Sequence, residues 1–252
     1  MNESLFNALV WAWIALAFIV VPLQLMITAP YGRHRSTKWG PGIDNRLGWI
    51  VMEGVSPVVF ALTLFANGGP QSSVVSIFAI LWIGHYFNRS VIYPLRTRTH
   101  GKLIPASIVA AGVGFNGFNG WINAFILTAS WTSYPDSWLA DPRFILGLII
   151  FMAGAAINIW SDNRLIALRR DSTADYSIPK GGMFRFISCP NHFGEMLEWT
   201  GYAILAWNLP ALSFAVWTAA NLGPRAISHH RWYRENFTDY PKDRKAFIPF
   251  LL

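Results

Sequence analysis

Residues 5–29 read LFNALVWAWIALAFIVVPLQLMITA and contain no charged side chain. An α-helix rises 1.5 Å per residue, so about twenty apolar residues are enough to cross the hydrocarbon layer of a bilayer. Further apolar stretches follow at about residues 47–66, 73–94, 104–129, 143–160, 193–208 and 210–230. The sequence therefore predicts an all-α, polytopic integral membrane protein with seven transmembrane helices. No linker divides the chain, so residues 1–252 are expected to form a single seven-helix membrane domain.

The composition also favours a membrane-embedded chain. Hydrophobic residues make up 53% of the sequence and charged residues only 13%, whereas soluble proteins carry about 25% charged residues. The net charge of +7 does not predict nucleic-acid binding, because the basic residues are not interleaved with exposed aromatic residues in a soluble domain. A single cysteine, Cys189, excludes an intrachain disulfide and argues against a metal site. The bilayer is the expected partner, and no obligate protein partner is indicated.

The positions of the basic residues predict how the chain is oriented in the membrane. In the seven-span interpretation, all of the 20 Lys and Arg residues except Arg143 lie on one side, and the loops 67–72 and 130–142 lie on the other. The positive-inside rule then places the N-terminus on the non-cytosolic side and the C-terminus in the cytosol, of either a bacterial inner membrane or the endoplasmic reticulum. Segment 171–184 is the longest polar interruption and is a candidate mobile cytosolic lid.

Polar residues at helical spacing mark the cytosolic ends of the last three predicted helices. The three sets are Asn158, Asp162 and Arg169; Asn191, Glu195 and Glu198; and Arg225, His229 and Tyr233. One interpretation is that they form interhelical hydrogen bonds and ion pairs. Their concentration at one depth instead favours a shared pocket, in which Arg pairs with phosphates while carboxylates and Asn hold ribose and amide groups. A dinucleotide would be bound without a Rossmann motif, since neither G-x-G-x-x-G after a strand nor a P-loop is present.

A second pair, Glu53 and Tyr86, falls inside the second and third predicted helices. Counting from the cytosolic ends of two antiparallel helices places both residues at similar depth, roughly 10 Å inside the membrane. A carboxyl group among apolar side chains favours its protonated form, so the pair can donate hydrogen bonds to a ligand carbonyl. The alternative is a structural hydrogen bond between two helices.

Several strings resemble the steroid 5-alpha-reductase family, in the same order along the chain. They are Gly84-His85-Tyr86-Phe87-Asn88-Arg89, Asn158-Ile159-Trp160-Ser161-Asp162, Ile178-Pro179-Lys180-Gly181-Gly182-Met183-Phe184, Asn191-His192-Phe193-Gly194-Glu195-Met196-Leu197-Glu198-Trp199, His229-His230-Arg231-Trp232-Tyr233, Asp239-Tyr240-Pro241-Lys242 and Arg244-Lys245-Ala246-Phe247-Ile248-Pro249-Phe250. The resemblance covers nearly the whole chain from Tyr31 onward.

This resemblance implies a seven-helix membrane fold with NADPH as cofactor. Helices one to four would form most of the cavity for a 3-oxo-4-ene steroid, and helices five to seven with the cytosolic loops would hold the cofactor. The positions that match the family's cofactor contacts are Tyr31, Lys102, Asn158, Asp162, Arg169, Tyr176, Asn191, Glu195, His229 and Tyr233. Glu53 and Tyr86 match its substrate-carbonyl pair. The chain departs from the animal enzymes at Ser177 and Ala111, where an Arg is usual.

The expected reaction is reduction of the 4-ene double bond of a 3-oxo-4-ene steroid to a 5-alpha-3-oxosteroid. Tyr86, supported by Glu53, would polarise the enone oxygen while NADPH delivers hydride to the beta carbon. Other reductase substrates remain open at this point, namely an enoyl-CoA, a polyprenol precursor or another sterol. Two further alternatives are a membrane methyltransferase that binds S-adenosylmethionine and a transporter with acidic sites in the membrane.

Overall fold

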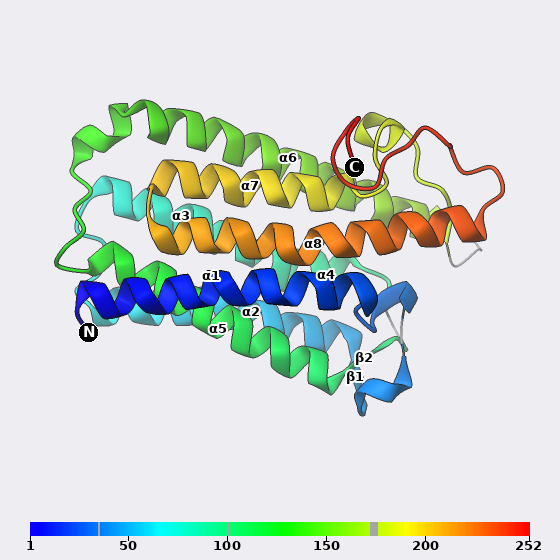
Figure 1. Ribbon diagram of the computed structural model, residues 1–252, viewed down its shortest axis with the longest axis horizontal. Coiled ribbons are helices and arrows are strands. Elements are labelled where there is room, and N and C mark those ends of the chain that lie inside the picture. The colour runs from blue at the N-terminus through cyan, green and yellow to red at the C-terminus, as the bar shows by residue number, and fades with distance from the viewer. Residues whose placement is uncertain (35, 100, 172–175) are drawn as a thin grey trace. The chain divides into compact units, whose positions relative to one another are not determined.

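The computed structural model describes residues 1–34, 36–99, 101–171 and 176–252. Nearly all of the regular structure in these residues is helical (Figure 1). The α-helices are α1 (Glu3–Met26), α2 (Asn45–Ala66), α3 (Ser73–Phe87), α4 (Tyr93–Arg96), α5 (Ala106–Thr128), α6 (Pro142–Asp171), α7 (Pro190–Ala206) and α8 (Leu209–Asn236). Short 3-10 turns lie at Gly32–His34, Thr37–Trp39, Asp136–Ala140 and Gly182–Arg185. The strands among the described residues are β1 (Gly42–Asp44) and β2 (Leu103–Pro105), so the all-α prediction is confirmed.

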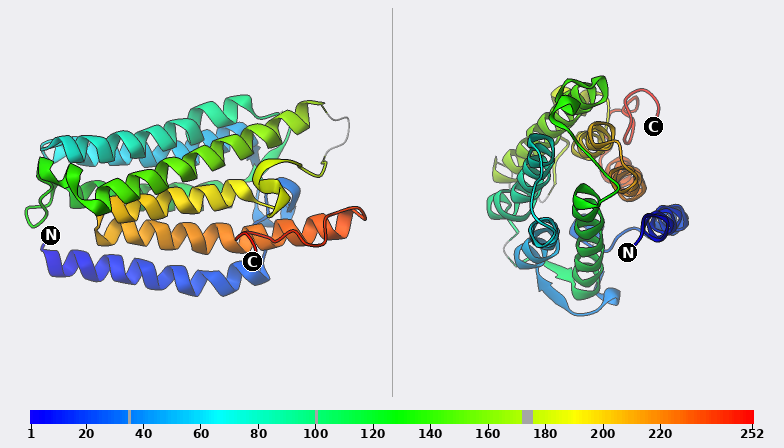
Figure 2. Two further views of the ribbon diagram at one scale, coloured as in Figure 1. Left: turned by 90° about the horizontal axis from the view of Figure 1, so that it is seen from above. Right: turned by 90° about the vertical axis from the view of Figure 1, so that its left-hand side faces the viewer.

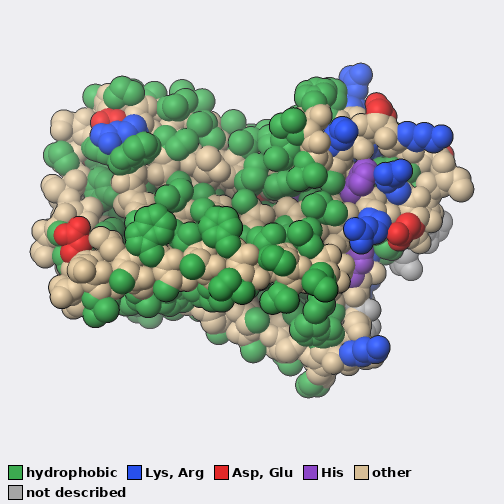
Figure 3. Space-filling view, viewed as in Figure 1, with side chains coloured by type: hydrophobic (Ala, Val, Ile, Leu, Met, Phe, Trp, Pro, Cys, Tyr) green, Lys and Arg blue, Asp and Glu red, His purple; other side chains and the backbone are tan. Residues whose placement is uncertain are grey.

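Four helical segments of the described chain are long and apolar enough to cross a membrane. They are Glu3–Met26, Asn45–Ala66, Ser73–Arg96 and Pro142–Arg169. Large hydrophobic side chains are exposed on α1, among them Leu5, Phe18 and Ile19, and hydrophobic side chains cover much of the face in Figure 3. Such exposure suits contact with lipid. The helices α5, α7 and α8 do not meet these criteria of length and apolar composition, and their role as membrane spans stays a prediction.

The predicted stretches and the observed helices differ most at two C-terminal ends. α6 continues beyond residue 160 to Asp171, and α8 continues beyond residue 230 to Asn236. The predicted ends followed hydropathy, whereas a helix continues through polar residues as long as no Gly or Pro interrupts its hydrogen bonds. A second difference is a π-helical turn, Asn88–Ile92, through which α3 passes into α4.

The described residues group into two compact units, of which the first comprises residues 1–10 and 29–144. α2 and α5 lie side by side in it (Figures 1 and 2). They approach closely at Gly120, where an added Cβ would lie 2.7 Å from the carbonyl oxygen of Ser56. The antiparallel strands β1 and β2 pair immediately before α2 and α5, with Ile43 opposite Ile104. Hydropathy does not predict strands of three residues that pair across such a sequence distance.

The second unit comprises residues 11–28 and 145–252. Its helices α6 and α7 are in backbone contact, because both carry glycines at a spacing of seven residues. A Cβ at Gly154 would lie 2.3 Å from the Glu198 nitrogen, and one at Gly194 would lie 2.5 Å from the Asn158 nitrogen. A second pair, Gly147 and Gly201, repeats this contact two turns away. Small residues allow two backbones to approach in this way.

α8 packs against both α7 and the second part of α1. α7 and α8 run side by side in Figures 1 and 2. The rings of Trp13 and Trp217 lie 4.7 Å apart, and Gln24 Nε2 donates to Asn221 Oδ1 at 2.7 Å. These contacts hold residues 11–28 against α8.

The predicted lid falls only partly on the described part of the chain, since residues 172–175 lie outside it. After them, the 3-10 turn Gly182–Arg185 packs on α6, with the ring of buried Phe184 6.2 Å from that of Trp160. A Cβ at Gly182 would lie 2.3 Å from the Trp160 ring, so glycine is required for this approach. The mobility of the segment stays a prediction.

Candidate active site

Tyr86 lies on α3 with its hydroxyl inside the first unit. Its side chain is 2% exposed, and its hydroxyl donates to Asn116 Oδ1 on α5 at 3.1 Å. Asn116 Nδ2 in turn donates to the carbonyl oxygen of Met52 on α2 at 2.7 Å. Because the amide nitrogen is committed to Met52, the amide oxygen faces Tyr86. One buried chain of hydrogen bonds thus joins α2, α3 and α5.

The backbone around Tyr86 is fixed by the π-helical turn that follows it. Ser90 lies in this turn, and its hydroxyl donates to the carbonyl oxygen of Tyr86 at 2.6 Å. The rings of Trp82 and His85 lie 5.4 and 5.2 Å from the Tyr86 ring. π-helical turns are often found at functional sites in helices.

Glu53 is half-buried on α2 and is the next residue after Met52. The carbonyl of Met52 is therefore the point at which the Tyr86–Asn116 chain reaches the backbone beside Glu53. Glu53 therefore lies on α2 next to the residue at which this hydrogen-bond chain ends.

The predicted cofactor residues of the first unit, Tyr31 and Lys102, lie near the start of α2. The half-buried Tyr31 packs next to Trp49, with ring centroids 6.2 Å apart. Lys102 is exposed just before β2, and its carbonyl accepts the N–H of Asn45 at 2.9 Å. The guanidinium of Arg89 lies 5.5 Å from the Trp49 ring centroid, which adds a cation to this end of the unit.

In the second unit, the polar faces of α6 and α7 meet. Asn158 Nδ2 donates to the carbonyl of Asn191 at 2.9 Å and to Glu195 Oε2 at 3.3 Å. Asn191 Nδ2 donates to Asp162 Oδ1 at 3.0 Å. The glycine contact beside Asn158 and Glu195 brings the two backbones close enough for these short side chains to bond. The structure therefore brings together Asn158, Asp162, Asn191 and Glu195.

His229 and Tyr233 on α8 are held by ring contacts. The ring of His229 lies 5.7 Å from that of His192 on α7, and buried Tyr233 stacks on Tyr240 at 5.2 Å with an interplanar angle of 8°. The remaining predicted residues, Arg169 and Tyr176, contact each other, with the guanidinium 5.9 Å from the phenol ring centroid. Tyr176 also packs edge-on against Trp232 at 5.0 Å.

Ser188, which the sequence interpretation did not single out, forms a hydrogen-bonded hub behind Tyr233. Its Oγ lies 2.7 Å from His230 Nδ1, 2.6 Å from the Tyr240 hydroxyl and 3.0 Å from the Lys245 carbonyl. Burial raises the pKa of the Tyr240 hydroxyl above its ordinary value. The hub fixes the C-terminal segment against α8 at the ring that stacks on Tyr233.

Asn116 is the other functional residue that the sequence interpretation missed. A signal for it exists: Asn116, Asn119 and Asn123 lie at helical spacing in an apolar helix, and all three are buried. Polar residues in such helices are functional candidates by default.

Comparison with known proteins gives this geometry a context. The family model described as 3-oxo-5-alpha-steroid 4-dehydrogenase matches residues 102–252. A steroid 5-alpha-reductase from Gossypium hirsutum is 40% identical over 95% of this chain and 91% of its own length. A 3-oxo-5-alpha-steroid 4-dehydrogenase 1 from Bos taurus is 37% identical over 100% of this chain and 98% of its own. A 3-oxo-5-alpha-steroid 4-dehydrogenase 2 from Homo sapiens is 39% identical, covering 91% of each chain.

The chain belongs to the steroid 5-alpha-reductase family. The resemblance seen in the sequence is therefore confirmed, and the protein is an enzyme of an oxidoreductase family. The family model spans α5 to α8, which carry Asn116 and most of the predicted cofactor residues. The full-length relatives also cover Glu53 and Tyr86.

Proposed function

We propose that this protein reduces the 4-ene double bond of a 3-oxo-4-ene steroid to the 5-alpha-3-oxosteroid. Bound NADPH would supply the hydride for the beta carbon of the enone, and with a proton added to the alpha carbon the products would be the saturated ketone and NADP⁺. The observation that carries the proposal is the buried Tyr86–Asn116–Met52 chain beside Glu53, in a member of this family. It supplies a buried, oriented phenol for an enone oxygen, and Glu53 is proposed as the supporting carboxyl group.

Tyr86 acts on the charge that develops during the reaction. A phenol carries one hydrogen, which Asn116 Oδ1 accepts in this structure. When the substrate binds, rotation about the C–O bond turns this hydrogen toward the enone oxygen, so that Tyr86 donates its hydrogen bond to the substrate. Glu53 supplies the supporting carboxyl group. As the oxygen gains negative charge, its hydrogen bonds strengthen, and they therefore lower the barrier more than they stabilise the bound substrate.

The residues of the second unit fit a dinucleotide. Asn158, Asp162, Asn191 and Glu195 combine amide donors with carboxylate acceptors, which suits ribose hydroxyls and a carboxamide. Arg169 is assigned to the phosphates, because a guanidinium group is a good phosphate partner, and Lys102 and Tyr31 of the first unit keep the cofactor role that the family resemblance implies. His229 and Tyr233 complete the set from α8, and Tyr176 lies beside Arg169. This positive charge favours NADPH over NADH.

We assign seven membrane spans to this single domain, with a non-cytosolic N-terminus, a cytosolic C-terminus and a cofactor pocket open to the cytosol. The four apolar helices support the assignment, and so does the asymmetry of the basic residues. Engineered cysteines in sealed vesicles test it. Residues 67–72 should react from the non-cytosolic side and residues 236–240 from the cytosolic side, and reaction of both from one side would contradict it.

Product analysis by mass spectrometry tests the reaction itself. Membranes that contain the protein are incubated with NADPH and a panel of enones, including steroids, enoyl thioesters and polyprenals. We expect a gain of two hydrogens in 3-oxo-4-ene steroids, and loss of that product in Tyr86→Phe. Reduction of a different enone class with steroids unchanged would contradict the substrate. Family membership disfavours the methyltransferase and transporter alternatives, and binding of S-adenosylmethionine or substrate flux without NADPH consumption would revive them.

A further inference from the structure

The C-terminal tip, residues 247–252, packs beside the middle of α8. Buried Ala246 and Phe247 form a cluster with Cys189 and Ala226, against which Leu222 and Ile227 of α8 also pack. In the proposed topology, α8 leaves the membrane near residue 230. Residues 222–227 therefore lie about 5 to 12 Å inside that boundary, at 1.5 Å per residue. In that topology, the base of the tip lies just inside the cytosolic boundary of the membrane, and its outer side chains lie near the interface.

The backbone of the tip is closed on itself. The N–H groups of Phe247 and Ile248 donate to the main-chain oxygen of Leu252, the last residue, and those of Leu251 and Leu252 donate to the carbonyl of Ile248. Phe250 makes this turn possible by adopting a positive φ of 66°. A non-helical segment needs internal hydrogen bonds of this kind when little water is available to its backbone.

The outer surface of the tip is apolar and aromatic. Phe250 and Leu251 are 76% and 79% exposed, and the ring of Phe250 lies 5.3 Å from that of exposed Phe186. The neighbouring Phe184 contacts Trp160, an exposed residue of the membrane-span candidate Pro142–Arg169. Buried Phe184 therefore anchors the turn that leads to Phe186 on a helix that is suited to lipid.

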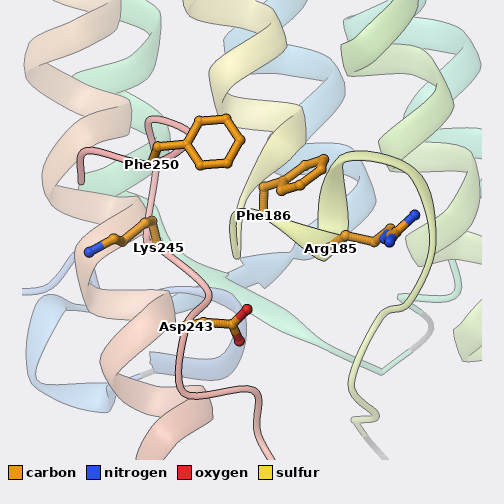
Figure 4. A pocket seen from close by; sticks show the side chains of 5 residues that line it. All are labelled: Arg185, Phe186, Asp243, Lys245 and Phe250. Atoms are coloured by element: carbon orange, nitrogen blue, oxygen red, sulfur yellow. The ribbon is translucent and has the colours of Figure 1, made fainter.

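Charged residues surround this surface without converging on one point. A pocket here is lined by Arg185, Phe186, Asp243, Lys245 and Phe250. Figure 4 shows the rings of Phe186 and Phe250 side by side, and the charged ends of Arg185 and Lys245 pointing away from each other on opposite sides of the pocket. Asp243 lies between them. A site for a single phosphate would require the two cations to converge. Diverging cations around an aromatic centre instead suit a lipid surface, where aromatic rings lie at the boundary and Arg and Lys reach the headgroups.

We propose that Phe186, Phe250 and Leu251 insert into the cytosolic interface of the bilayer, with Arg185 and Lys245 at the level of the lipid phosphates. The occupant of this surface is phospholipid, and the inference rests on the proposed topology but not on the identity of the steroid. Since the Lys245 carbonyl accepts a hydrogen bond from Ser188, lipid contact at the tip also anchors the segment that bears the Ser188–Tyr240 hub.

Depth-dependent quenching tests the placement in the full-length protein. A polarity-sensitive fluorophore is attached to Phe250→Cys in phospholipid nanodiscs, with Asp239→Cys as the matched control in the same exposed segment. Native Cys189 is buried, so labelling of the wild type measures the background. We expect shallow spin-labelled lipid to quench the Phe250→Cys probe at least about threefold more strongly than aqueous iodide, and the reverse for Asp239→Cys.

A second arm tests the cations. Changing neutral lipid to lipid with an anionic phosphoglycerol headgroup should shift the probe emission to shorter wavelength, and Arg185→Gln with Lys245→Gln should remove that shift. Stronger quenching by iodide than by lipid at residue 250 would overturn the proposal. Shielding from both quenchers would also overturn it, because a protein surface would then cover the tip. Steroid turnover of each labelled variant is measured in parallel, so that a failure of membrane placement is distinguished from a failure of the proposed enzyme function.

Discussion

Tyr86 and Asn116 are expected to act as one unit in the chemical step, and a double-mutant cycle can show it. Tyr86→Phe keeps the ring and removes the phenol hydrogen that is proposed to be donated to the enone oxygen. Losing one preorganised donor to a developing oxyanion costs about 10²–10³ in rate, or roughly 2.7 to 4 kcal/mol. Asn116→Leu leaves the phenol but removes the acceptor that orients its hydroxyl before the substrate binds, at 3.1 Å, and the donor to the Met52 carbonyl, at 2.7 Å. A typical hydrogen bond contributes about 1 kcal/mol net, so losing both corresponds to about 2 kcal/mol, and we expect kcat to fall by about thirtyfold at most.

The interaction term decides between a positioning role and a structural one. If Asn116 acts by orienting the Tyr86 hydroxyl, Asn116→Leu should have little further effect on kcat in the Tyr86→Phe background. NADPH oxidation with saturating steroid measures kcat, and bound NADPH after gel filtration shows whether cofactor retention is unchanged. An additional tenfold loss in the double variant would refute the positioning role. Near-normal turnover of Tyr86→Phe would refute the proposed carbonyl site itself, so the two failures are distinct.

Asn116→Asp adds a readout that a purely structural role would not produce. A protonated Asp can donate to the Met52 carbonyl and accept from Tyr86, as the amide does, whereas a carboxylate has no hydrogen to donate. We therefore expect the kcat of this variant, relative to wild type, to rise as the pH falls. A constant ratio across the pH range would contradict this reasoning.

Three further predictions concern the second unit. Gly154→Ala should lower the free energy of unfolding by about 1–3 kcal/mol and weaken NADPH retention, because its Cβ would lie 2.3 Å from the Glu198 nitrogen; Gly114→Ala, with open space around it, should leave the Tm unchanged or slightly raised. Arg169→Gln should reduce the ratio of kcat/KM for NADPH to kcat/KM for NADH by about tenfold or more. The control Arg164→Gln, at an exposed residue of the same helix, should leave this ratio unchanged. Equal ratios in the two variants would show that Arg169 does not bind the phosphates. Burial raises the pKa of Tyr240 in the folded protein, so its contribution to stability is present below the unfolded pKa near 10 and is lost as the pH rises through the folded pKa. Tyr240→Phe should therefore flatten the fall in Tm above about pH 10. An unchanged slope of Tm against pH would contradict the assignment.

The parts of the fold that sequence predicts well are those set by local hydropathy. The apolar stretch 5–29 corresponds to α1, because long uncharged runs favour a buried or lipid-covered helix wherever they occur. The same rule ended the stretch 143–160 too early, since it carries no information on the polar extension of α6 to Asp171.

The parts of the site that were missed depend on partners far away in the sequence. Asn116 gains its role from the Met52 carbonyl and the Tyr86 hydroxyl, which lie on two other helices. Gly154 is informative only when it is opposed to Gly194, and neither residue signals a contact by itself. The spacing of Asn158 and Asp162 did place them on one face of α6, because helical periodicity is a local property.

The glycine contact between α6 and α7 has a mechanical consequence. With backbone against backbone at Gly154 and Gly194, a slide of either helix by one residue would press a Cβ into the opposing main chain. The two helices can therefore shift or tilt only as a rigid pair. Because Asn158 and Glu195 lie beside this contact, these two groups, which are proposed to bind the cofactor, keep a constant separation during any movement that admits or releases it. Such a rigid pair would bind or release its ligand by moving relative to other helices, and not by separation of α6 from α7.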